Sequence, residues 1–594
     1  MQSLTRNRKT GWWSLLPALL LSCTLAGCEG DDGKDGATGA TGPAGTDGTD
    51  GAAGLNCWDL NQNGVPDIAV EDLNRDGVVD VNDCRTPTGG YTGVTIHSGY
   101  FTENPYVGTV QCLNCHGKIG DDVLETAHWK WEGTVANIAG FEGTIHGKKD
   151  LINNFCQAVP SNEGRCAQCH IGYGWNDKSY DFSNPRNIDC LACHDQTGTY
   201  KKVAFPTAAQ PVVGGPEPTV NLTNVAKSVG LNGGVPPRAA CVFCHSRAGG
   251  DDNVKHGDIN SRFGLTAPGS DTNPDPFDRT EDVHMGVDGG NFTCVRCHQA
   301  DDQHGIAGFM YHSVDEGGDM QECTDCHAPS IHVGTSVENM LTFHERLACQ
   351  VCHIPTIARK VATYTDWRWS MAGSPTPPPE CAATPTGVAA NGTQRGTYNT
   401  QKGCFTWGQN VRPTLRYYNG KWNRMIMGYN DSFTTTPVDL GSPTATYRDA
   451  DAKIYPFKKM TGNQAADSNP ANRIILVPHL FGYSTTDTPR GGVNPYWPIG
   501  LGIPAGYTGY NWIGALMDTA AYSPAYNGGD TSFSGTYDFV DTVMLLKVDH
   551  EVAPKEMAYG MGGACGDCHL NGQIDWAALG WTADPANGGT QTLP

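Results

Sequence analysis

The pentapeptide CLNCH at residues 112–116 is the first of eight Cys-x-x-Cys-His motifs, which we number sites 1 to 8 in chain order. Two cysteines three residues apart lie on one face of a helical turn and can form thioethers with both vinyl groups of a haem, while the adjacent histidine binds the iron. Zinc knuckles and redox disulfides also use Cys-x-x-Cys, but neither needs a histidine after every second cysteine. The motifs therefore predict eight covalently attached haem c groups. The predicted attachment cysteines are Cys112, Cys115, Cys166, Cys169, Cys190, Cys193, Cys241, Cys244, Cys294, Cys297, Cys323, Cys326, Cys349, Cys352, Cys565 and Cys568, and the predicted proximal iron ligands are His116, His170, His194, His245, His298, His327, His353 and His569.

The spacing of the motifs sets an expectation for the fold. Seven motifs lie within residues 112–353, whereas residues 354–564 contain none. A porphyrin is a large apolar plate, so haems at this density replace much of the side-chain core. We expect a mainly α fold with extensive coil and little sheet, organised around eight haems that are packed closely enough to exchange electrons. Residues 354–564 are expected to add loops and short elements over the haems.

The remaining histidines are candidates for the second axial position of each iron. The chain has 19 histidines, and 19 − 8 leaves eleven outside the motifs. Haems that transfer electrons are commonly six-coordinate, and histidine is the abundant second ligand in this chain. His97 is the least expected of the eleven, because it precedes the haem region. The predicted distal ligands are His128, His256, His284, His304, His312, His332, His344, His479 and His550.

The other cysteines suggest an oxidising compartment. Of 23 cysteines, sixteen belong to the motifs and two lie near the N-terminus at Cys23 and Cys28, which leaves five. Cys57 with Cys84 and Cys381 with Cys404 are predicted disulfides. Cys156 is then left over, either as a reactive thiol or as a small buried apolar residue.

The acidic composition of the chain disfavours some classes of binding partner. The chain has 594 residues, with 40 Lys and Arg against 62 Asp and Glu, for a net charge of −22. This balance disfavours nucleic acid and anionic lipid as partners. The 75 glycines and 37 prolines indicate much irregular backbone.

The first residues have the pattern of an export signal. Residues 1–27 contain a basic start, a short apolar run and the sequence Leu25-Ala26-Gly27 before Cys28, which is typical of a lipoprotein signal peptide with Cys28 as the lipidated residue. A transmembrane anchor is the weaker alternative, since the apolar run is short and is interrupted by Pro17. We expect an exported lipoprotein in the outer membrane of a Gram-negative bacterium, on its periplasmic or cell-surface face.

Two further segments precede the haem region. Residues 28–56 contain glycine at every third position with little proline, and we interpret them as a Gly-X-Y spacer. Residues 57–86 resemble a dockerin or EF-hand-type calcium module, and the alternative is an acidic, turn-rich linker. The predicted calcium ligands are Asp72, Asn74, Asp76, Asp80 and Asp83. The cytochrome-like body is then residues 90–594, with the motif-free insert at about 354–564.

Several stretches around the motifs resemble the octahaem tetrathionate reductase family of cytochromes c. The similarity runs from about residue 90 to the C-terminus and is strong through residue 370. The spacer and the calcium-like module lie outside it. The matching stretches are CLNCH with ETAHWKWEG, NNFC with CAQCHIGYGW, DCLACHDQTGTY, DNVKHGD at 252–258, CTDCHAPSIH, ACQVCHIP and DWRWS at 366–370.

This resemblance implies a chain of bis-histidine haems and one unusual haem at site 2. There the family has a lysine as distal ligand, which matches Lys255, with an acid and a thiol beside it that match Asp252 and Cys156. A lysine that can leave the iron would open a position for substrate. The implied reaction is the two-electron cleavage of tetrathionate to two thiosulfates, with nitrite or hydroxylamine as alternative substrates. A redox partner cytochrome or a quinol-linked donor would supply the electrons.

Two alternative functions, neither of them enzymatic, remain open. A lipid anchor, a spacer and many haems also suit a non-catalytic electron conduit at the cell surface, which passes electrons to minerals or partner cytochromes. The coordination of the irons would separate the two, because eight bis-histidine irons favour a conduit and one lysine-ligated iron favours a reductase. A surface adhesin built on the Gly-X-Y and calcium segments is the weaker reading.

Overall fold

The computed structural model falls into two units, residues 1–55 and 56–594, and the described residues all lie in the second. Cys28, the spacer, Cys57, Cys84 and the predicted calcium ligands lie outside the described residues. The structure describes residues 94–592 except for 156, 161, 205–211, 247–254, 265–276, 311–313, 317–319, 375, 383–386, 389–393, 396, 400–401, 472, 480–511, 518–532, 562–563 and 571–573. Among the helices it describes, none combines the length and apolar character that crossing a bilayer requires.

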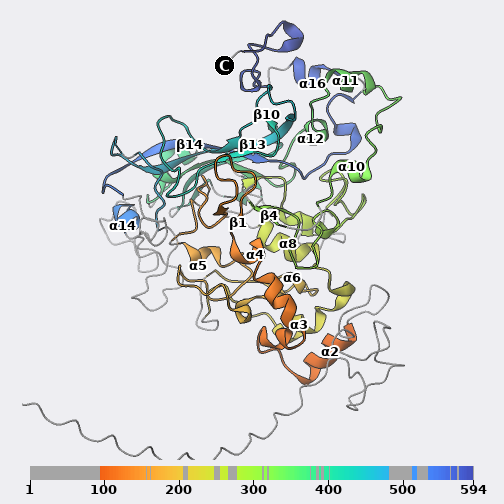
Figure 1. The fold of residues 1–594 in the computed structure, drawn as a ribbon, viewed down its shortest axis with the longest axis vertical. Helices are drawn as coiled ribbons and strands as arrows, with labels where there is room; N and C mark the ends of the chain where they lie inside the picture. The colour runs from red at the N-terminus through yellow and green to blue at the C-terminus, as the bar shows by residue number, and fades with distance from the viewer. Residues whose placement is uncertain are drawn as a thin grey trace, which may run out of the picture. The chain divides into compact units, whose positions relative to one another are not determined.

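Short helices carry the motifs, as the thioether geometry requires. Most of these helices end at or near the proximal histidine of their site (Figure 1). The α-helices are α2 (Val94–Glu103), α3 (Val110–Val123), α4 (Ala127–Lys130), α5 (Glu163–Cys166), α6 (Cys190–His194), α7 (Leu222–Ser228), α8 (Arg238–His245), α10 (Cys323–Cys326), α11 (Glu338–Phe343), α12 (Cys349–His353), α13 (Pro379–Ala382), α14 (Trp512–Met517) and α16 (Gly566–His569). The 3-10 turns are η2 (Pro185–Asn187), η3 (Leu231–Gly234), η4 (Ser261–Gly264), η5 (Cys294–Arg296), η6 (Trp369–Met371), η8 (Lys555–Met557), η10 (Ala577–Leu579) and η11 (Pro585–Asn587).

The expectation of a mainly α fold with little sheet was wrong. Of the described residues, 27% are helical and 21% lie in strands, and they contain a mixed sheet of eight strands. All eight strands come from residues 363–547, the segment expected to form loops and short elements. The sheet strands are β5 (Thr363–Arg368), β8 (Tyr398–Asn399), β9 (Gly403–Gly408), β10 (Thr414–Tyr418), β11 (Trp422–Arg424), β12 (Val438–Pro443), β13 (Lys453–Asp467) and β14 (Tyr537–Lys547). The remaining short strands are β1 (Gly133–Thr134), β2 (Ile145–His146), β3 (Gly308–Met310), β4 (Val314–Glu316), β6 (Gly387–Val388) and β7 (Gln394–Arg395).

The antiparallel pair β13 and β14 forms the middle of this sheet (Figure 1). Its register runs from Phe457 opposite Lys547 to Asp467 opposite Tyr537. The strand order is β11-β12-β14-β13-β5-β9-β8, and β10 also pairs with β13. The pairs β12 with β14 and β13 with β5 are parallel, so distant segments of the chain must meet before the sheet can form.

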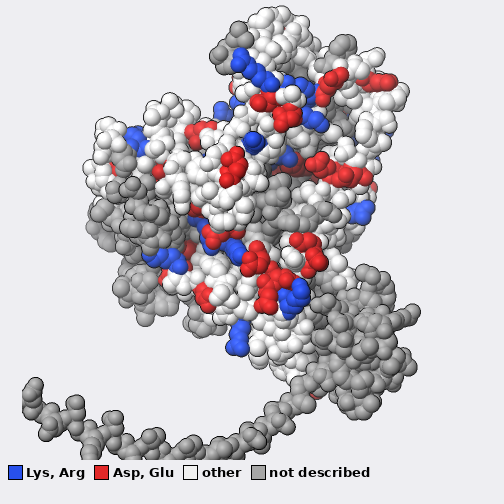
Figure 2. Space-filling model, in the orientation of Figure 1, with Lys and Arg blue, Asp and Glu red and all other residues white. Residues whose placement is uncertain are grey.

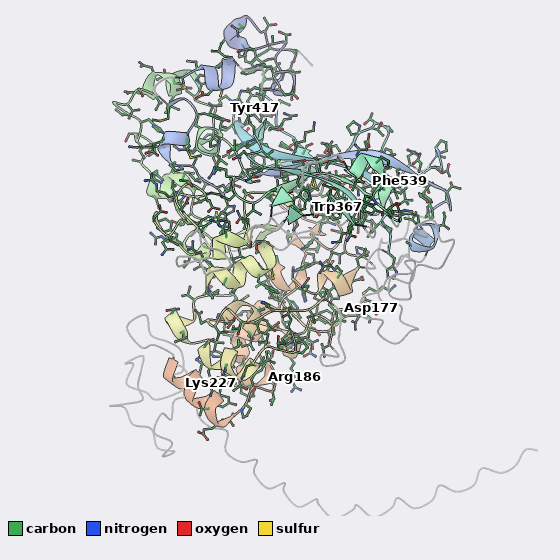
Figure 3. All side chains as sticks on the ribbon, turned by 180° about the vertical axis from the view of Figure 1, so that it is seen from behind. Asp177, Arg186, Lys227, Trp367, Tyr417 and Phe539 are labelled. Atoms are coloured by element: carbon green, nitrogen blue, oxygen red, sulfur yellow. A yellow bond between two sulfur atoms is a disulfide. The ribbon has the colours of Figure 1, made fainter. Side chains whose placement is uncertain are left out.

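The largest hydrophobic cluster packs on this sheet. It contains Trp367, Trp369 and Met460, all fully buried, together with Ile152 and Phe155 from the segment before site 2. Trp367 and Trp369 stack with their rings 4.7 Å apart. Figure 3 labels Trp367, Tyr417 and Phe539 on the sheet and Asp177, Arg186 and Lys227 in the helical part. The sheet therefore supplies a side-chain core of its own.

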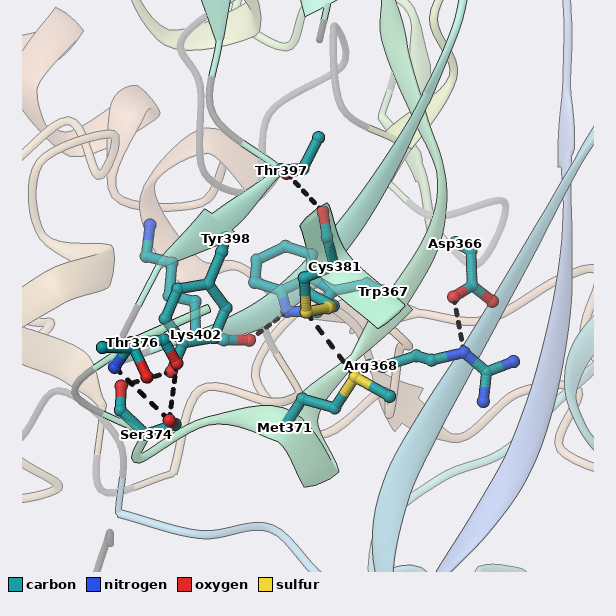
Figure 4. Close-up of a disulfide and its surroundings, with 11 residues drawn as sticks. Asp366, Trp367, Arg368, Met371, Ser374, Thr376, Cys381, Thr397, Tyr398 and Lys402 are labelled. Carbon is teal, nitrogen blue, oxygen red and sulfur yellow. Dashed lines mark hydrogen bonds and ion pairs between the residues drawn. A yellow bond between two sulfur atoms is a disulfide. The ribbon is translucent and has the colours of Figure 1, made fainter. Parts of the chain in front are cut away.

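The predicted disulfide Cys381–Cys404 is confirmed. Its Cα atoms lie 5.5 Å apart, and it joins α13 to β9 (Figure 4). The Sγ of Cys381 lies 3.7 Å from the Sδ of Met371, and Thr397 donates a hydrogen bond to the Cys381 carbonyl at 2.7 Å. The disulfide fastens one edge of the sheet beside its tryptophan cluster.

Candidate functional site

Histidine rings face one another at most of the motif sites. Imidazole nitrogens bind transition metals at about 2 Å, so two rings on opposite sides of one iron have centroids about 6 Å apart. Among the described residues, six proximal histidines have a second histidine ring at 6.0–6.4 Å. The pairs are His97–His116, His128–His245, His284–His327, His298–His550, His332–His353 and His344–His569. The donor sets at these six sites therefore fit haem irons with two axial histidines.

Hydrogen bonds at Nδ1 orient many of these rings. His298 is held by the carbonyl of Ala307 at 2.9 Å, and His344 by that of Met340 at 2.8 Å. His550 and His569 are held by carboxylates instead, from Asp258 at 3.3 Å and Asp584 at 2.7 Å. A partner on one ring nitrogen fixes the ring and leaves Nε2 for a metal.

Site 1 reverses one expectation from the sequence. His97 was the least expected distal ligand, yet its ring faces that of His116 with an angle of 11° between the two planes. It lies on α2, and α2 packs against α7. A position before the first motif is therefore no obstacle, because α2 folds back onto the haem region.

Site 3 has a histidine close by as well. Burial chiefly lowers the pKa of His194, and the charges of His304 and His97 lower it further, so both histidines lie near site 3. The Nδ1 of His194 is held by the carbonyl of Gly234 at 2.8 Å. Since His97 already faces His116, His304 is the candidate for the second histidine of site 3.

The sites adjoin one another in a continuous series. Cysteines of neighbouring motifs lie close enough to shift one another's pKa in the pairs Cys112 and Cys190, Cys169 and Cys244, Cys241 and Cys294, and Cys323 and Cys349. Burial and then the charge of Cys326 raise the pKa of Cys297, and burial and then Cys568 raise that of Cys352 to about 11. Cys193 is likewise close to Cys241 and Cys244. The resulting order is site 1, 3, 4, 5, 6, 7 and 8, with site 2 joining at site 4.

Site 2 has different surroundings. Among the described residues, the rings that contact His170 are all tryptophan, tyrosine or phenylalanine, with centroids 4.8–5.8 Å away. The Nε2 of His170 contacts the carbonyl of Trp129 at 2.6 Å, while its buried Nδ1 has no hydrogen-bond partner in the described part of the chain. Within the described part of the chain, site 2 therefore has neither the facing histidine nor the Nδ1 anchor found at paired sites such as site 5.

Positive charge gathers at site 2 although the chain as a whole is acidic. A hydrogen bond from Cys244 chiefly lowers the pKa of Cys169 to about 5, and the charges of Lys148, Arg165 and Lys255 lower it further. Burial chiefly lowers the pKa of His170 to about 3, and Lys202, Lys149 and Lys148 add to this effect. On the face displayed in Figure 2, acidic side chains form several groups. An anion would therefore be attracted to site 2 against the overall charge.

Lys255 lies at this site, buried with 7% of its surface exposed. Its Nζ is 5.5 Å from the ring centroid of Phe155. Burial and a nearby metal ion both favour the neutral form of an amine, and only that form can act as a ligand. The placement suits the ligand role that the resemblance implied for Lys255.

The sheet supports the polypeptide that leads into site 2. Asn154 donates to the carbonyl of Met460 at 2.8 Å, and Gln464 donates to that of Asn153 at 3.0 Å, so the segment before α5 is bound to β13. Asn162, at the start of α5, donates to the carbonyl of Pro478 at 3.1 Å. The sheet that the sequence did not reveal is therefore what positions site 2.

The other predicted site residues have varied positions. Cys156, Asp252 and His312 lie outside the described residues. His256 contacts the carbonyl of Lys547 through Nδ1 at 2.7 Å. His479 is buried and follows Pro478, so its backbone adjoins α5.

Comparisons with known proteins agree with this geometry. The crystal structure of an octahaem cytochrome c from Shewanella oneidensis is similar to this chain with 33% sequence identity and a TM-score of 0.64, over 83% of this chain and 98% of that one. This chain belongs to the multihaem c-type cytochromes. The family model described as "Cytochrome c bacterial" matches residues 364–572 of the cytochrome, which include most of the sheet and site 8. The comparison with curated proteins found no match. The family implies covalently bound haem c, whose iron the paired histidines would bind.

Proposed function

We propose that this cytochrome carries eight haems and reduces a small sulfur or nitrogen oxyanion at site 2, with tetrathionate as the substrate. The observation that carries the proposal is the contrast at His170: where other proximal histidines face a histidine, it has aromatic rings, Lys255 and a group of cations around it. The remaining sites supply electrons to site 2 through their continuous contacts. Nitrite and hydroxylamine are the alternative substrates.

The residues of site 2 suit this reaction. When bound, haem iron supplies one-electron transfers and a coordination position whose ligand can be exchanged. Lys255 is buried beside the site, and a neutral amine there could occupy that position and leave it. Lys148 and Arg165 would draw in a dianion. The reaction is S4O6²⁻ + 2 e⁻ → 2 S2O3²⁻, which breaks the central sulfur–sulfur bond and consumes no proton.

Asp252 and Cys156 extend this proposal from the resemblance. Asp252 lies three residues before Lys255 in the sequence and could hold its amine. A Cys156 thiolate could attack the central sulfur–sulfur bond, forming Cys–S–S2O3⁻ and releasing one thiosulfate. Two electrons would then break the new sulfur–sulfur bond, which releases the second thiosulfate and restores the thiolate.

A non-catalytic conduit is the second candidate. The series of adjacent sites and the six paired histidine sets favour long-range electron transfer whether or not site 2 is catalytic. In that role site 2 would have two protein ligands that do not exchange. Whether Lys255 is an exchangeable ligand at site 2 therefore distinguishes a reductase from a conduit.

We further propose that the cytochrome is an exported lipoprotein of the outer membrane. Support comes from the signal-like residues 1–27 and from Cys28 after Leu25-Ala26-Gly27. Its donor would be a partner cytochrome or a quinol-linked protein, and the module at residues 57–86 would bind calcium. Replacement of Cys28 by serine should release the mature protein from the membrane fraction, and unchanged membrane attachment would contradict the lipid anchor.

The reductase proposal is tested with Lys255→Ala in the fully loaded protein. We expect low-temperature EPR of the ferric wild type to show one species that is not bis-histidine, and Lys255→Ala to abolish that species and tetrathionate reduction together. Lys227→Ala on α7 is the control, because Lys227 lies outside the segments that surround site 2 and its replacement should change neither. Unchanged tetrathionate reduction in Lys255→Ala would refute the assignment.

A further inference from the structure

The four residues Lys255 to Asp258 reach from site 2 to site 5. Lys255 lies beside site 2, as described above. Asp258, three residues later and 2% exposed, accepts hydrogen bonds from the backbone N–H groups of Asp549 and His550 at 3.0 and 3.1 Å. The same Oδ2 lies 3.3 Å from Nδ1 of His550, the histidine that faces His298 at site 5. Three residues span at most about 10 Å, so this segment links the two sites directly.

The segment has little freedom to move. Its Gly257 has a φ of +78°, and a Cβ there would lie 2.8 Å from the side chain of Thr363 on β5. The carbonyl of Gly257 accepts a hydrogen bond from Ala358 at 3.1 Å, and His256 is held by the carbonyl of Lys547 on β14. The backbone between Lys255 and Asp258 is thus held against two strands of the sheet.

Asp258 itself is part of a buried charged group. The Nζ of Lys458, which is fully buried, donates to Oγ1 of Thr363 at 2.6 Å and lies close enough to Asp258 for their charges to interact. Replacement of the carboxylate would therefore change the forces on His550 without removing a side chain from the core.

We propose that Asp258 is a positioning residue that couples the two sites: it holds His550 toward His298, while the residues before it hold Lys255 beside site 2. This inference rests on the proposed function, because it takes Lys255 as a ligand of site 2. A carboxylate on the second nitrogen of a ligating histidine fixes the ring and makes the ligand more basic, which favours the ferric state. Because the backbone between Lys255 and Asp258 is held against the sheet, a change in the force on Lys255 at site 2 is passed along the segment to Asp258 and alters the hold on His550.

The chain offers a matched control at site 8. Asp584 contacts Nδ1 of His569 at 2.7 Å and, like Asp258, accepts a backbone hydrogen bond, here from Ala586 at 2.9 Å. It has no segment that leads to Lys255. Asp258→Asn and Asp584→Asn therefore make the same chemical change at two sites, and only the first lies on the proposed link.

The test compares the two variants by EPR-monitored redox titration of the loaded proteins. We expect Asp258→Asn to raise the midpoint potential of the site 5 component, by 59 mV for each tenfold loss of ferric stabilisation, and to change the g-values of the Lys255 species. Asp584→Asn should shift the site 8 component alone. If Asp258→Asn leaves the Lys255 species unchanged, or if Asp584→Asn changes it equally, the coupling is refuted.

Lys255→Ala gives the reciprocal measurement, since coupling acts in both directions. It should shift the site 5 component, and an unchanged site 5 component would overturn the proposal even if Asp258→Asn did not fold. The two proposals fail in different ways. Absence of a lysine-ligated species in the wild type removes the reductase assignment, whereas its presence with an unaffected site 5 removes only the coupling.

Discussion

Sites 2 and 5 carry the same pentapeptide pattern and differ in nearly everything around it. At site 5, His298 faces His550 at 6.0 Å with the rings 19° from parallel, and a backbone carbonyl anchors His298. At site 2, His170 is enclosed by aromatic rings and approached by lysines. The motif therefore determines where a haem is attached, and the residues from other segments determine what that haem does.

The two sites also rest on the fold in different ways. The segment before site 2 hydrogen-bonds to β13 and contributes Phe155 to the sheet core, and Lys255 is held by a segment that packs on β5 and β14. His298 of site 5 is oriented by a neighbouring loop at Ala307. A site that must release a ligand and bind substrate gains from a rigid support, because small displacements of catalytic groups are costly.

The largest effect is expected when site 2 is made to resemble site 5. Lys255→His supplies a second histidine that does not leave readily, so we expect the reductase kcat to fall roughly 10³-fold, or about 4 kcal/mol in activation free energy. The EPR species assigned to lysine should be replaced by a bis-histidine signal. Steady-state assays with tetrathionate and EPR on the same preparation provide the measurement.

The control for this change is Lys149→His in the neighbouring loop. Lys149 pairs with Glu132 at 2.6 Å, so its replacement changes one charge near site 2 without altering Lys255. Full reductase activity in Lys255→His would show that the difference between sites 2 and 5 has no catalytic meaning.

A second change weakens the support of site 2 rather than the site. Gln464 on β13 is fully buried; it donates to the carbonyl of Asn153 and accepts from Thr542 at 2.9 Å. Gln464→Ala leaves these buried groups unsatisfied, so we expect the free energy of unfolding to fall by about 2 kcal/mol. Chemical denaturation measures this loss, and EPR should show a broadened site 2 signal with unchanged paired sites.

Asn463→Ala is the matched control for that change. Asn463 is the preceding residue on β13 and donates to Asp541 of β14 at 3.1 Å, so its bond stays within the sheet. It should leave the site 2 signal unchanged. Equal disturbance of all signals by Gln464→Ala would mean that the sheet supports every site alike.

The short helical turns of the motifs could be predicted from the sequence, and the histidine pairs could not. A Cys-x-x-Cys-His motif is local, and each one lies on or beside the short helical turn that its spacing predicts. The partner of a proximal histidine comes from elsewhere in the chain, as with His298 and His550, so counting histidines gives the supply but not the pairing. His97 was given too little weight for the same reason, since the return of α2 onto the haem region is a tertiary event.

The sheet was missed because its central strands lack the usual pattern. In β13 the residues from Gly462 to Asp467 are buried in an unbroken run, and they include Gln464 and Asp467. Half-buried strands are recognised by the alternation of apolar and polar residues. Here polar residues are satisfied by distant partners such as Asn153 and Ser534, which no local window contains. The high glycine and proline content of the segment then favoured a prediction of loops.

A third substitution tests whether an iron with an open coordination position is sufficient for reductase activity. His97→Ala removes the ring that faces His116 at site 1, yet no group of cations was found around that site among the described residues. We expect one bis-histidine EPR component to be lost and tetrathionate reduction to fall by less than about tenfold, or 1.4 kcal/mol. New reductase activity that survives the additional change Lys255→His would show that an open iron is sufficient.

The smallest effect is expected from a single cation at site 2. The Nζ of Lys148 lies 3.9 Å from the centroid of Trp131, which itself contacts His170, and its charge influences both Cys169 and His170. Because Lys148 is half-buried and partly screened, Lys148→Ala should weaken attraction of a dianion by only about 1 kcal/mol, which corresponds to a KM for tetrathionate about fivefold higher at low salt. Lys149→Ala should raise the KM for tetrathionate by less, because Glu132 already compensates that charge.

Hydroxylamine is the control substrate, since it carries no charge at neutral pH and its KM should be unaffected by Lys148→Ala. An equal rise in KM for both substrates would mean that Lys148 shapes the site rather than attracting the anion.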